Sequence, residues 1–262
     1  MIDKTRYFMF DFLKRKNKIE PIFEVLGVDM HNHMVPGVDD GSESLEMSAE
    51  CIGTMWEAGF RKMFVTPHFN FPRYNNDEDD IVRRYGELKQ YLADSGVEME
   101  LQGIGGEYRI DDGFQDRLAN PRFLKIGVDN YLLLEISMHH HRMGFEKVIY
   151  DIQMNDQQVI LAHPERYLYL DVDSSKFEKL KDQWVIFQCN ILSLSVFYGG
   201  EPQKRALKMI ERGWVELLGT DMHNTTYARG LAEATHSRTV RKVLEKYEFM
   251  NRELVEKTHH RL

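Results

Sequence analysis

Short apolar runs alternate with stretches of helical spacing along the chain. The runs are rich in residues that favour strands, and polar or glycine-containing segments bound them. Seven such runs occupy residues 25–30, 62–67, 98–104, 131–136, 158–162, 185–189 and 215–219. We therefore predict seven strands with helices between them.

The intervening segments repeat apolar residues every three or four positions. The clearest helix face consists of Leu45, Ala49, Ile52 and Trp56, and Gly59 suits the end of that helix. Residues 81–92 repeat the spacing, and Pro202 suits the first turn of a helix continuing through 206–210. Alternating strands and helices predict one α/β domain with a parallel sheet. A closed barrel is our prediction, and an open doubly wound sheet is the alternative.

Residues 1–24 differ from the rest and are treated as an N-terminal extension to a domain at 25–262. Phe8, Phe10 and Phe12 precede the basic run 14–16, and Pro21 follows. One interpretation is an amphipathic anchor with weak contact to an anionic membrane surface or to a partner protein. The other is a helix packed on the domain, or a solvated tail.

Composition and charge narrow the classes of function. The net charge of −8 does not favour nucleic-acid binding, which needs a basic surface. No apolar stretch reaches the roughly 18 residues of a membrane span, and the N-terminus does not resemble a signal peptide. The two cysteines form no recognisable disulfide framework. These features predict a cytoplasmic protein; its oligomeric state stays open.

Histidines and acids recur where the predicted strands end. These candidate ligands are His31, His33, His68, Glu107, His163, Asp221 and His223. Barrel enzymes place their active sites at this end of the sheet. In extended backbone, residues i and i+2 point to the same side, so His31 and His33 can face one ion, as can Asp221 and His223.

The ligand types indicate which ions fit. Imidazoles and carboxylates without thiolates suit manganese, iron, zinc or magnesium. The set is too large for one ion, and neighbouring ions can hold both the attacking and the leaving oxygen of a displacement at phosphorus. We therefore predict two or three divalent ions in a phosphoesterase.

Other polar residues have two interpretations. Of Asp39 and Asp40, at most one binds metal while the other caps the following helix. Glu135 either supports the ligands or caps a helix. We expect the run His139–His141 to stay outside the site, and His236, His259 and His260 to be solvated.

Two alternative phosphatase chemistries are excluded. A cysteine phosphatase needs an arginine six positions after its cysteine, but Glu57 and Ser195 occupy the positions after Cys51 and Cys189. Both cysteines are expected in the core. The chain also has no glycine-rich P-loop.

Six motifs together resemble the PHP (polymerase and histidinol phosphatase) superfamily, and specifically its bacterial capsule-linked protein-tyrosine phosphatases of the CpsB/CapC type. The motifs lie at residues 29–33, 38–41, 66–68, 105–107, 162–166 and 221–224, and residues 73–75 also resemble that branch. The resemblance runs from about residue 25 to the C-terminus. It implies a distorted (β/α)7 TIM-like barrel and a three-metal centre, usually of manganese.

The resemblance also implies roles for individual residues. The implied metal ligands are His31, His33, Asp40, His68, Glu107, His163, Asp221 and His223, with Glu107 as the bridging carboxylate. Arg166 is implied to grip the substrate phosphate, and Tyr74 and Arg229 are candidate substrate contacts. The implied substrate is phosphotyrosine on a membrane-associated bacterial tyrosine kinase that controls polysaccharide export.

Several alternatives stay open at this point. Asp221, His223 and a metal-bound water are the candidates to protonate the leaving tyrosinate. Arg166 is alternatively a surface arginine paired with Glu165. The rival functions are a small-molecule phosphatase of the histidinol-phosphatase kind, a non-catalytic metal-binding scaffold, and a nuclease.

Overall fold

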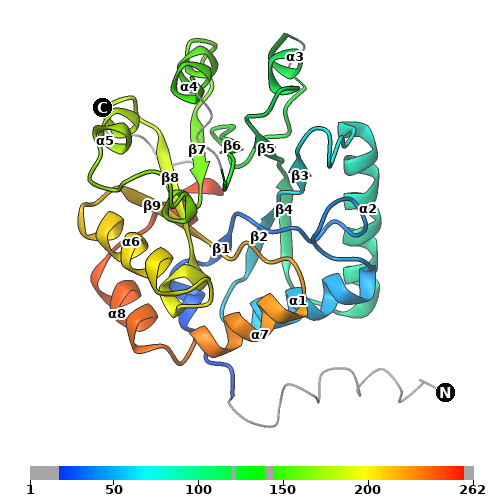
Figure 1. Cartoon of the computed structure of the whole chain (residues 1–262). Helices are drawn as coiled ribbons and strands as arrows, with labels where there is room; N and C mark the ends of the chain where they lie inside the picture. Colours follow the sequence, from blue (N-terminus) through cyan, green and yellow to red (C-terminus); the bar gives the residue numbers. More distant parts are fainter. Residues whose placement is uncertain (1–17, 120–121, 140–143, 257–262) are drawn as a thin grey trace, which may run out of the picture.

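The computed structural model describes residues 18–119, 122–139 and 144–256. Its strands pair in parallel in two sheets (Figure 1). The first sheet has the order β1 (Val28–Asp29), β2 (Lys62–Val65), β4 (Glu100–Ile104). The second has the order β3 (His68–Phe69), β5 (Glu107–Arg109), β6 (Leu132–Glu135), β7 (Val159–Ala162), β8 (Ile186–Asn190), β9 (Val215–Gly219).

The two sheets meet where two of the predicted strands, 62–67 and 98–104, end. Only two residues separate β2 from β3, and Gly105 and Gly106 separate β4 from β5. A Cβ on Gly106 would lie 2.7 Å from the ring of Phe69, so the chain can pass here only without a side chain. The sequence missed β3 and β5 because each follows directly on an apolar run that reads as one strand.

The first strand is shorter than predicted. Residues Ile22–Val25 form the 3₁₀ helix η3, and Gly27 adopts a left-handed conformation before β1 begins. Beyond the strand ends, the backbone N–H of Asp221 donates to the carbonyl oxygen of His31 at 2.8 Å. The N–H of His33 likewise donates to Met222 at 2.8 Å. These bonds connect the segment after β1 to the segment after β9.

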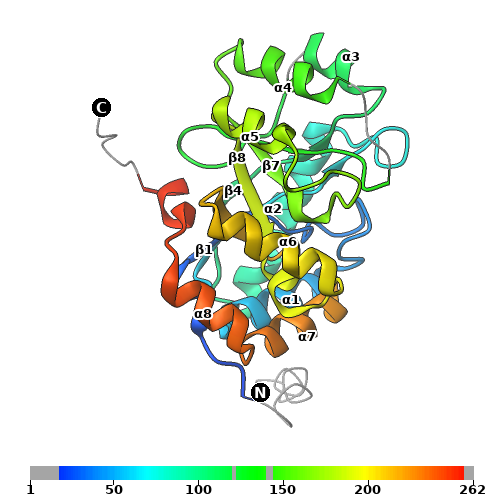
Figure 2. The same cartoon turned by 60° about the vertical axis from the view of Figure 1, so that its left-hand side comes forward.

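Helices lie around the outside of the strands (Figures 1 and 2). The first two are α1 (Leu45–Glu57), capped by Ser44, and α2 (Glu78–Ser95), capped by Asp77. The predicted helix faces at 45–56 and 81–92 are confirmed, Gly59 follows the end of α1, and Pro202 lies in the first turn of α6. The remaining helices are α3 (Phe114–Ala119), α4 (Phe145–Gln153), α5 (Ser175–Asp182), α6 (Gly200–Glu211), α7 (Thr225–Ala234) and α8 (Arg238–Lys246). Short 3₁₀ helices are η4 (Pro164–Arg166), η5 (Ile191–Ser195) and η6 (Met250–Leu254).

Most of the strands are buried on both faces, as parallel strands covered by helices usually are, whereas β4 is only partly buried. Leu132 and Leu134 of β6 belong to the large core beneath the helices. Leu133 points the other way, into a smaller inner cluster that η6 covers with Leu254. The full inner cluster is Val28, Met30, Phe64, Ile126, Tyr131, Leu133, Ile160, Ala162, Leu217 and Leu254. Cys51 and Cys189 are free and buried, as predicted.

The described part of the N-terminal extension packs onto the domain. Phe23 is fully buried, and its ring stacks on Phe60 with centroids 5.5 Å apart. The aromatic and basic positions of residues 1–17 lie outside the described residues. No helix in the described part of the chain is both long and apolar enough to cross a membrane.

Candidate metal centre and substrate cavity

The predicted ligands converge where the strands end. His31 and His33 follow β1, and Asp40 lies further along the same segment before α1. His68 and Glu107 begin β3 and β5, His163 follows β7, and Asp221 and His223 follow β9. Four overlapping groups of three could each hold an ion, with ligand atoms within 4.8 Å of one another. They are His33–His68–His223, His31–His33–Asp221, His31–Glu107–His163 and His68–Glu107–Glu135.

Glu107 lies at the centre of the cluster and is fully buried. Its Oε2 lies 3.3 Å from His31 Nε2, 3.4 Å from His33 Nε2 and 3.0 Å from His68 Nδ1. Its Oε1 lies 2.9 Å from Nε2 of His163. Burial raises the pKa of Glu107, but the charges of His31 and His68 outweigh burial and hold it well below its usual range. One ionised carboxylate is therefore shared by four imidazoles.

Asp221 is the second shared carboxylate. Its Oδ1 lies 3.3 Å from His33 Nε2 and 3.5 Å from His31 Nε2. Both Asp221 and His163 have positive φ, at 50° and 34°, which is uncommon for residues other than glycine. Such local backbone strain is tolerated where surrounding contacts fix the backbone. Both strained residues are candidate metal ligands. Asp29 is one such contact, because its carboxylate accepts from the Thr220 N–H at 2.8 Å.

Three histidines are held through their other ring nitrogen, as metal-binding histidines commonly are. His223 Nδ1 lies 2.8 Å from the backbone oxygen of Asp221. His31 Nδ1 lies 2.8 Å from Gln188 Oε1, and His33 Nδ1 lies 2.9 Å from Asp39 Oδ2. The expected helix-capping role for Asp39 is wrong, because Ser44 caps α1. Asp39 instead also accepts the backbone N–H groups of His68 and Gly41 at 2.9 Å. A Cβ on Gly41 would lie 2.2 Å from the carbonyl oxygen of His33, so only glycine allows this loop to close on the ligand.

The remaining acids and histidines have these places. Asp40 Oδ1 lies 3.5 Å from His68 Nε2 and 3.8 Å from His223 Nε2 at the cavity mouth. Glu135 Oε1 lies 3.6 Å from His68 Nδ1, so Glu135 supports or binds at the cluster and caps no helix. His139 lines the cavity although we expected it outside, while His140 and His141 lie outside the described residues. His236 is exposed, as expected, and lies 3.3 Å from Glu20, while His259 and His260 lie outside the described residues.

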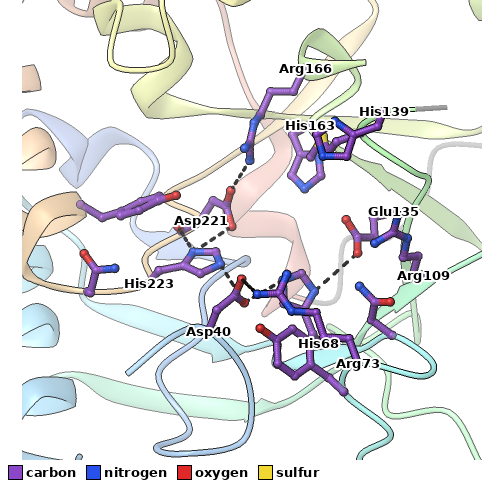
Figure 3. Close-up of a pocket in the computed structure, with 15 residues that line it drawn as sticks. Asp40, His68, Arg73, Arg109, Glu135, His139, His163, Arg166, Asp221 and His223 are labelled. Atoms are coloured by element: carbon purple, nitrogen blue, oxygen red, sulfur yellow. Dashed lines mark hydrogen bonds and ion pairs between the residues drawn. The ribbon is translucent and has the colours of Figure 1, made fainter. Parts of the chain in front are cut away.

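Above the cluster is a cavity of about 350 Å³ (Figure 3). Three arginines line it: Arg73, Arg109 and Arg166. Arg166 donates from Nη1 to Asp221 Oδ2 at 2.9 Å, and its guanidinium lies 4.3 Å above the ring of Tyr198. The alternative pairing with Glu165 is wrong, because that buried carboxylate accepts from Asn190 N–H and Ser193 Oγ.

Aromatic rings border the same cavity. Tyr74 stacks on His68 with centroids 5.7 Å apart, and Tyr227 lies 5.0 Å from the ring of His223. Arg229 is exposed on α7 and donates to Thr225 and Thr226 of its own helix. The structure does not bring Arg229 to the cavity lining.

The donor set fits a cluster of divalent ions. Nδ1 of His163 is buried without a hydrogen-bond partner in the described structure, and Glu107 Oε2 and His68 Nδ1, although 3.0 Å apart, form no well-aligned hydrogen bond. Such buried polar atoms carry a free-energy cost unless another group engages them. Imidazole and carboxylate ligands from several strand ends, with hydrogen bonds orienting three of the imidazoles, are typical of a site for manganese, iron, zinc or magnesium.

Fold and site together define a class: a parallel α/β protein whose strand ends carry a histidine–carboxylate centre for metal ions, beneath an arginine-lined cavity. Residues 27–256 match the CpsB/CapC family of capsular polysaccharide synthesis, and the chain belongs to that family. The resemblance stated from the six motifs is thereby confirmed.

Named relatives point the same way. The Bacillus subtilis tyrosine-protein phosphatase YwqE is 25% identical over 197 residues, covering 75% of this chain and 77% of that protein. The Staphylococcus aureus putative tyrosine-protein phosphatase CapC is 27% identical over 199 residues, covering 76% and 78%.

Solved structures show the fold. One match belongs to the crystal structures of Bacillus subtilis YwqE and Streptococcus pneumoniae CpsB, described as unique metal-dependent tyrosine phosphatases. It has a TM-score of 0.72 at 23% identity, covering 87% of this chain and 94% of that one. The lactonase Lmo2620 from Listeria monocytogenes matches with a TM-score of 0.53 at 12% identity, covering 90% and 98%.

Proposed function

We propose that this chain is a metal-dependent protein-tyrosine phosphatase. The observation that carries the proposal is the shared position of Glu107 and Asp221 among five imidazoles, directly beneath a cavity lined by three arginines. The family membership and the names of the relatives support it. The substrate we propose is phosphotyrosine on a bacterial tyrosine kinase of polysaccharide export.

We further propose two or three divalent ions at the cluster, with manganese preferred over iron, zinc and magnesium. His31, His33, His68, His163 and His223 would hold them with Glu107 and Asp221, and with Asp40 at the mouth. Bound ions of this kind supply Lewis-acid neutralisation of phosphoryl oxygens. Chemistry at the site otherwise depends on the chain's own groups.

Those groups divide the remaining work. Arg166 is placed to bind phosphoryl oxygens with a planar fork of N–H donors while its ion pair fixes Asp221. Asp221 and His223 border the cavity and are the candidates to protonate the leaving phenolate. A phenol has a pKa of about 10, well below that of an alcohol, so tyrosinate leaves with little acid help.

The aromatic border favours phosphotyrosine over a smaller substrate. The rings of Tyr74 and Tyr227 lie on the histidines at the cavity mouth and offer faces for a substrate ring.

The test compares turnover of a phosphotyrosine peptide with that of histidinol phosphate, with metal content measured on the same preparation. We expect the peptide to be preferred. A preference for histidinol phosphate would mean that the proposed substrate is wrong. No turnover of either compound by protein with full metal content would favour the alternative of a non-catalytic metal-binding scaffold. The nuclease alternative predicts cleavage of nucleic acid, which the acidic charge disfavours.

The remaining proposals concern fold and setting. We propose that the two sheets are parts of one distorted seven-stranded barrel, supported by the bonds joining the segments after β1 and β9. We keep the cytoplasmic location and the membrane-associated kinase partner as proposals that follow from the substrate. Weak membrane contact through residues 1–24 also stays a prediction.

A further inference from the structure

Arg109 differs from the other two arginines of the cavity. It lies two residues after Glu107 on β5, so both side chains leave the strand on the same side. Glu107 enters the metal cluster, and Arg109 lines the cavity one step further along the strand. Figure 3 shows Arg73, Arg109 and Arg166 approaching the cavity from different directions.

The other two arginines already have partners. Arg166 is bonded to Asp221 Oδ2 at 2.9 Å, and Arg73 lies 3.8 Å from Asp40 Oδ2 at the exposed rim. Arg109 has no hydrogen bond or ion pair with any side chain in residues 18–119, 122–139 and 144–256. Its register partner is Glu135 on β6, and no ion pair within 4.0 Å joins the two.

A partly buried guanidinium that has no side-chain hydrogen bond or ion pair among the described residues is suited to an anionic ligand. Its five N–H donors match the oxygens of a phosphate through two parallel hydrogen bonds. It also faces a cavity directly beside Glu135 and the ligand His68, where a phosphoryl group must come to be hydrolysed. The competing explanation is that Arg109 only offsets the negative charge of Glu135.

We propose that Arg109 is a substrate-binding residue that binds the phosphoryl oxygens from β5. It would act together with Arg166, whose guanidinium also bonds to Asp221. The proposal rests on the proposed phosphatase function and adds a residue to it. Arg109 then contributes mainly to holding the bound phosphomonoester, because no side chain in the described part of the chain accepts a hydrogen bond from its guanidinium.

The test measures binding of inorganic phosphate to the metal-loaded enzyme by titration calorimetry, besides kinetics on a phosphotyrosine peptide. Hydrogen bonds to charged groups predict that Arg109→Ala weakens phosphate binding by at least about tenfold. KM should rise by a similar factor while kcat changes less. Arg109→Lys restores the charge without the fork and should recover only part of the affinity. Arg122→Ala is the matched control, since Arg122 is exposed and pairs with Asp79 away from the cavity.

Each outcome decides the proposal. Unchanged phosphate affinity in Arg109→Ala with full metal content would overturn it. Complete rescue by Arg109→Lys would also overturn it, because charge compensation of Glu135 would then suffice. Should Arg109→Ala fail to fold or load metal, the lysine variant decides: partial affinity supports the proposal and wild-type affinity overturns it. Wild-type protein that binds phosphate through Arg109 but hydrolyses no phosphotyrosine would contradict the proposed function alone.

Discussion

The two ends of the same strands have opposite chemistry. Toward their starts, the inner side chains are apolar, such as Val28 on β1 and Leu217 on β9, and Leu254 of η6 covers them. At or just beyond their other ends, the same strands carry His31 and Asp221. The starts of the strands bury apolar area. The other ends bury polar atoms, several of which lack hydrogen-bond partners in the described structure.

The contrast separates stability from function. Apolar burial near the starts of the strands stabilises the fold roughly in proportion to the buried area. The ends of the strands, where the metal cluster lies, bury imidazoles and carboxylates, which is unfavourable unless these groups are paired or bind metals. Changes at the metal cluster should therefore alter metal binding and turnover. Changes at the apolar starts of the strands should alter the free energy of unfolding.

The largest effect is expected from removing a ligand. His33→Ala should lower turnover of a phosphotyrosine peptide by more than about 100-fold, because even the outer partners of metal ligands are worth 10- to 100-fold. Asp221→Ala should behave similarly, and both variants should stay folded by circular dichroism. A strong chelator should abolish turnover in the wild type, and manganese should restore it. His236→Ala is the matched control, and full activity of metal-free protein would refute the metal centre.

A change at the opposite end should affect stability alone. Leu254 is fully buried beneath the strands, so Leu254→Ala should lower the free energy of unfolding by about 2–5 kcal/mol. Denaturant melts with metal-loaded protein measure this, and kcat/KM at a temperature where both proteins are folded should not change. Val82→Ala, at an exposed position of α2, is the control. A large loss of kcat/KM with intact metal content would show that the two ends are coupled.

A smaller effect is expected from the residue that orients His33. Asp39→Asn keeps the size of the side chain but removes the charge that faces His33 Nδ1, so metal affinity should fall about 10- to 100-fold. Competition with a fluorescent chelator measures the affinity, and Glu43→Gln on the same loop is the control. Wild-type affinity in Asp39→Asn would leave the carboxylate with a purely backbone role at His68 and Gly41.

The ligands were predictable because strand ends and the spacing of two are local signals. His31 with His33, and Asp221 with His223, needed only the alternation of extended backbone. The same rule applied to Glu107 would have found Arg109, two residues on. Asp39 could not be separated from Asp40 by sequence, because the choice depends on which carboxylate reaches His33 Nδ1 across a folded loop.

The fold was predictable to the level of its apolar runs. Runs 62–67 and 98–104 each predicted one strand. The structure instead has two strands in each region, β2 and β3 separated by residues 66–67, and β4 and β5 separated by Gly105 and Gly106. Such breaks depend on contacts between elements, here the ring of Phe69 against Gly106, which local patterns do not contain. The partner of Arg166 was likewise a tertiary property, since Asp221 lies 55 residues away in sequence while Glu165 is adjacent.

The last prediction is that alkylation of the cysteines has no effect. It concerns Cys189, which lies on β8 near the metal cluster. Cys189 is fully buried on β8, next to Asn190, whose side-chain N–H donates to Asp221 Oδ2 at 2.7 Å. Burial raises the pKa of the Cys189 thiol well above its usual range and that of Cys51 to about 12, so neither is a thiolate at neutral pH. Iodoacetamide should therefore leave turnover and metal content unchanged in the folded enzyme, while mass spectrometry after unfolding in denaturant finds both thiols reactive. Modification of Cys189 in the native enzyme with loss of activity would mean that β8 opens at its site end, and would break the separation between a packed strand interior and a functional rim.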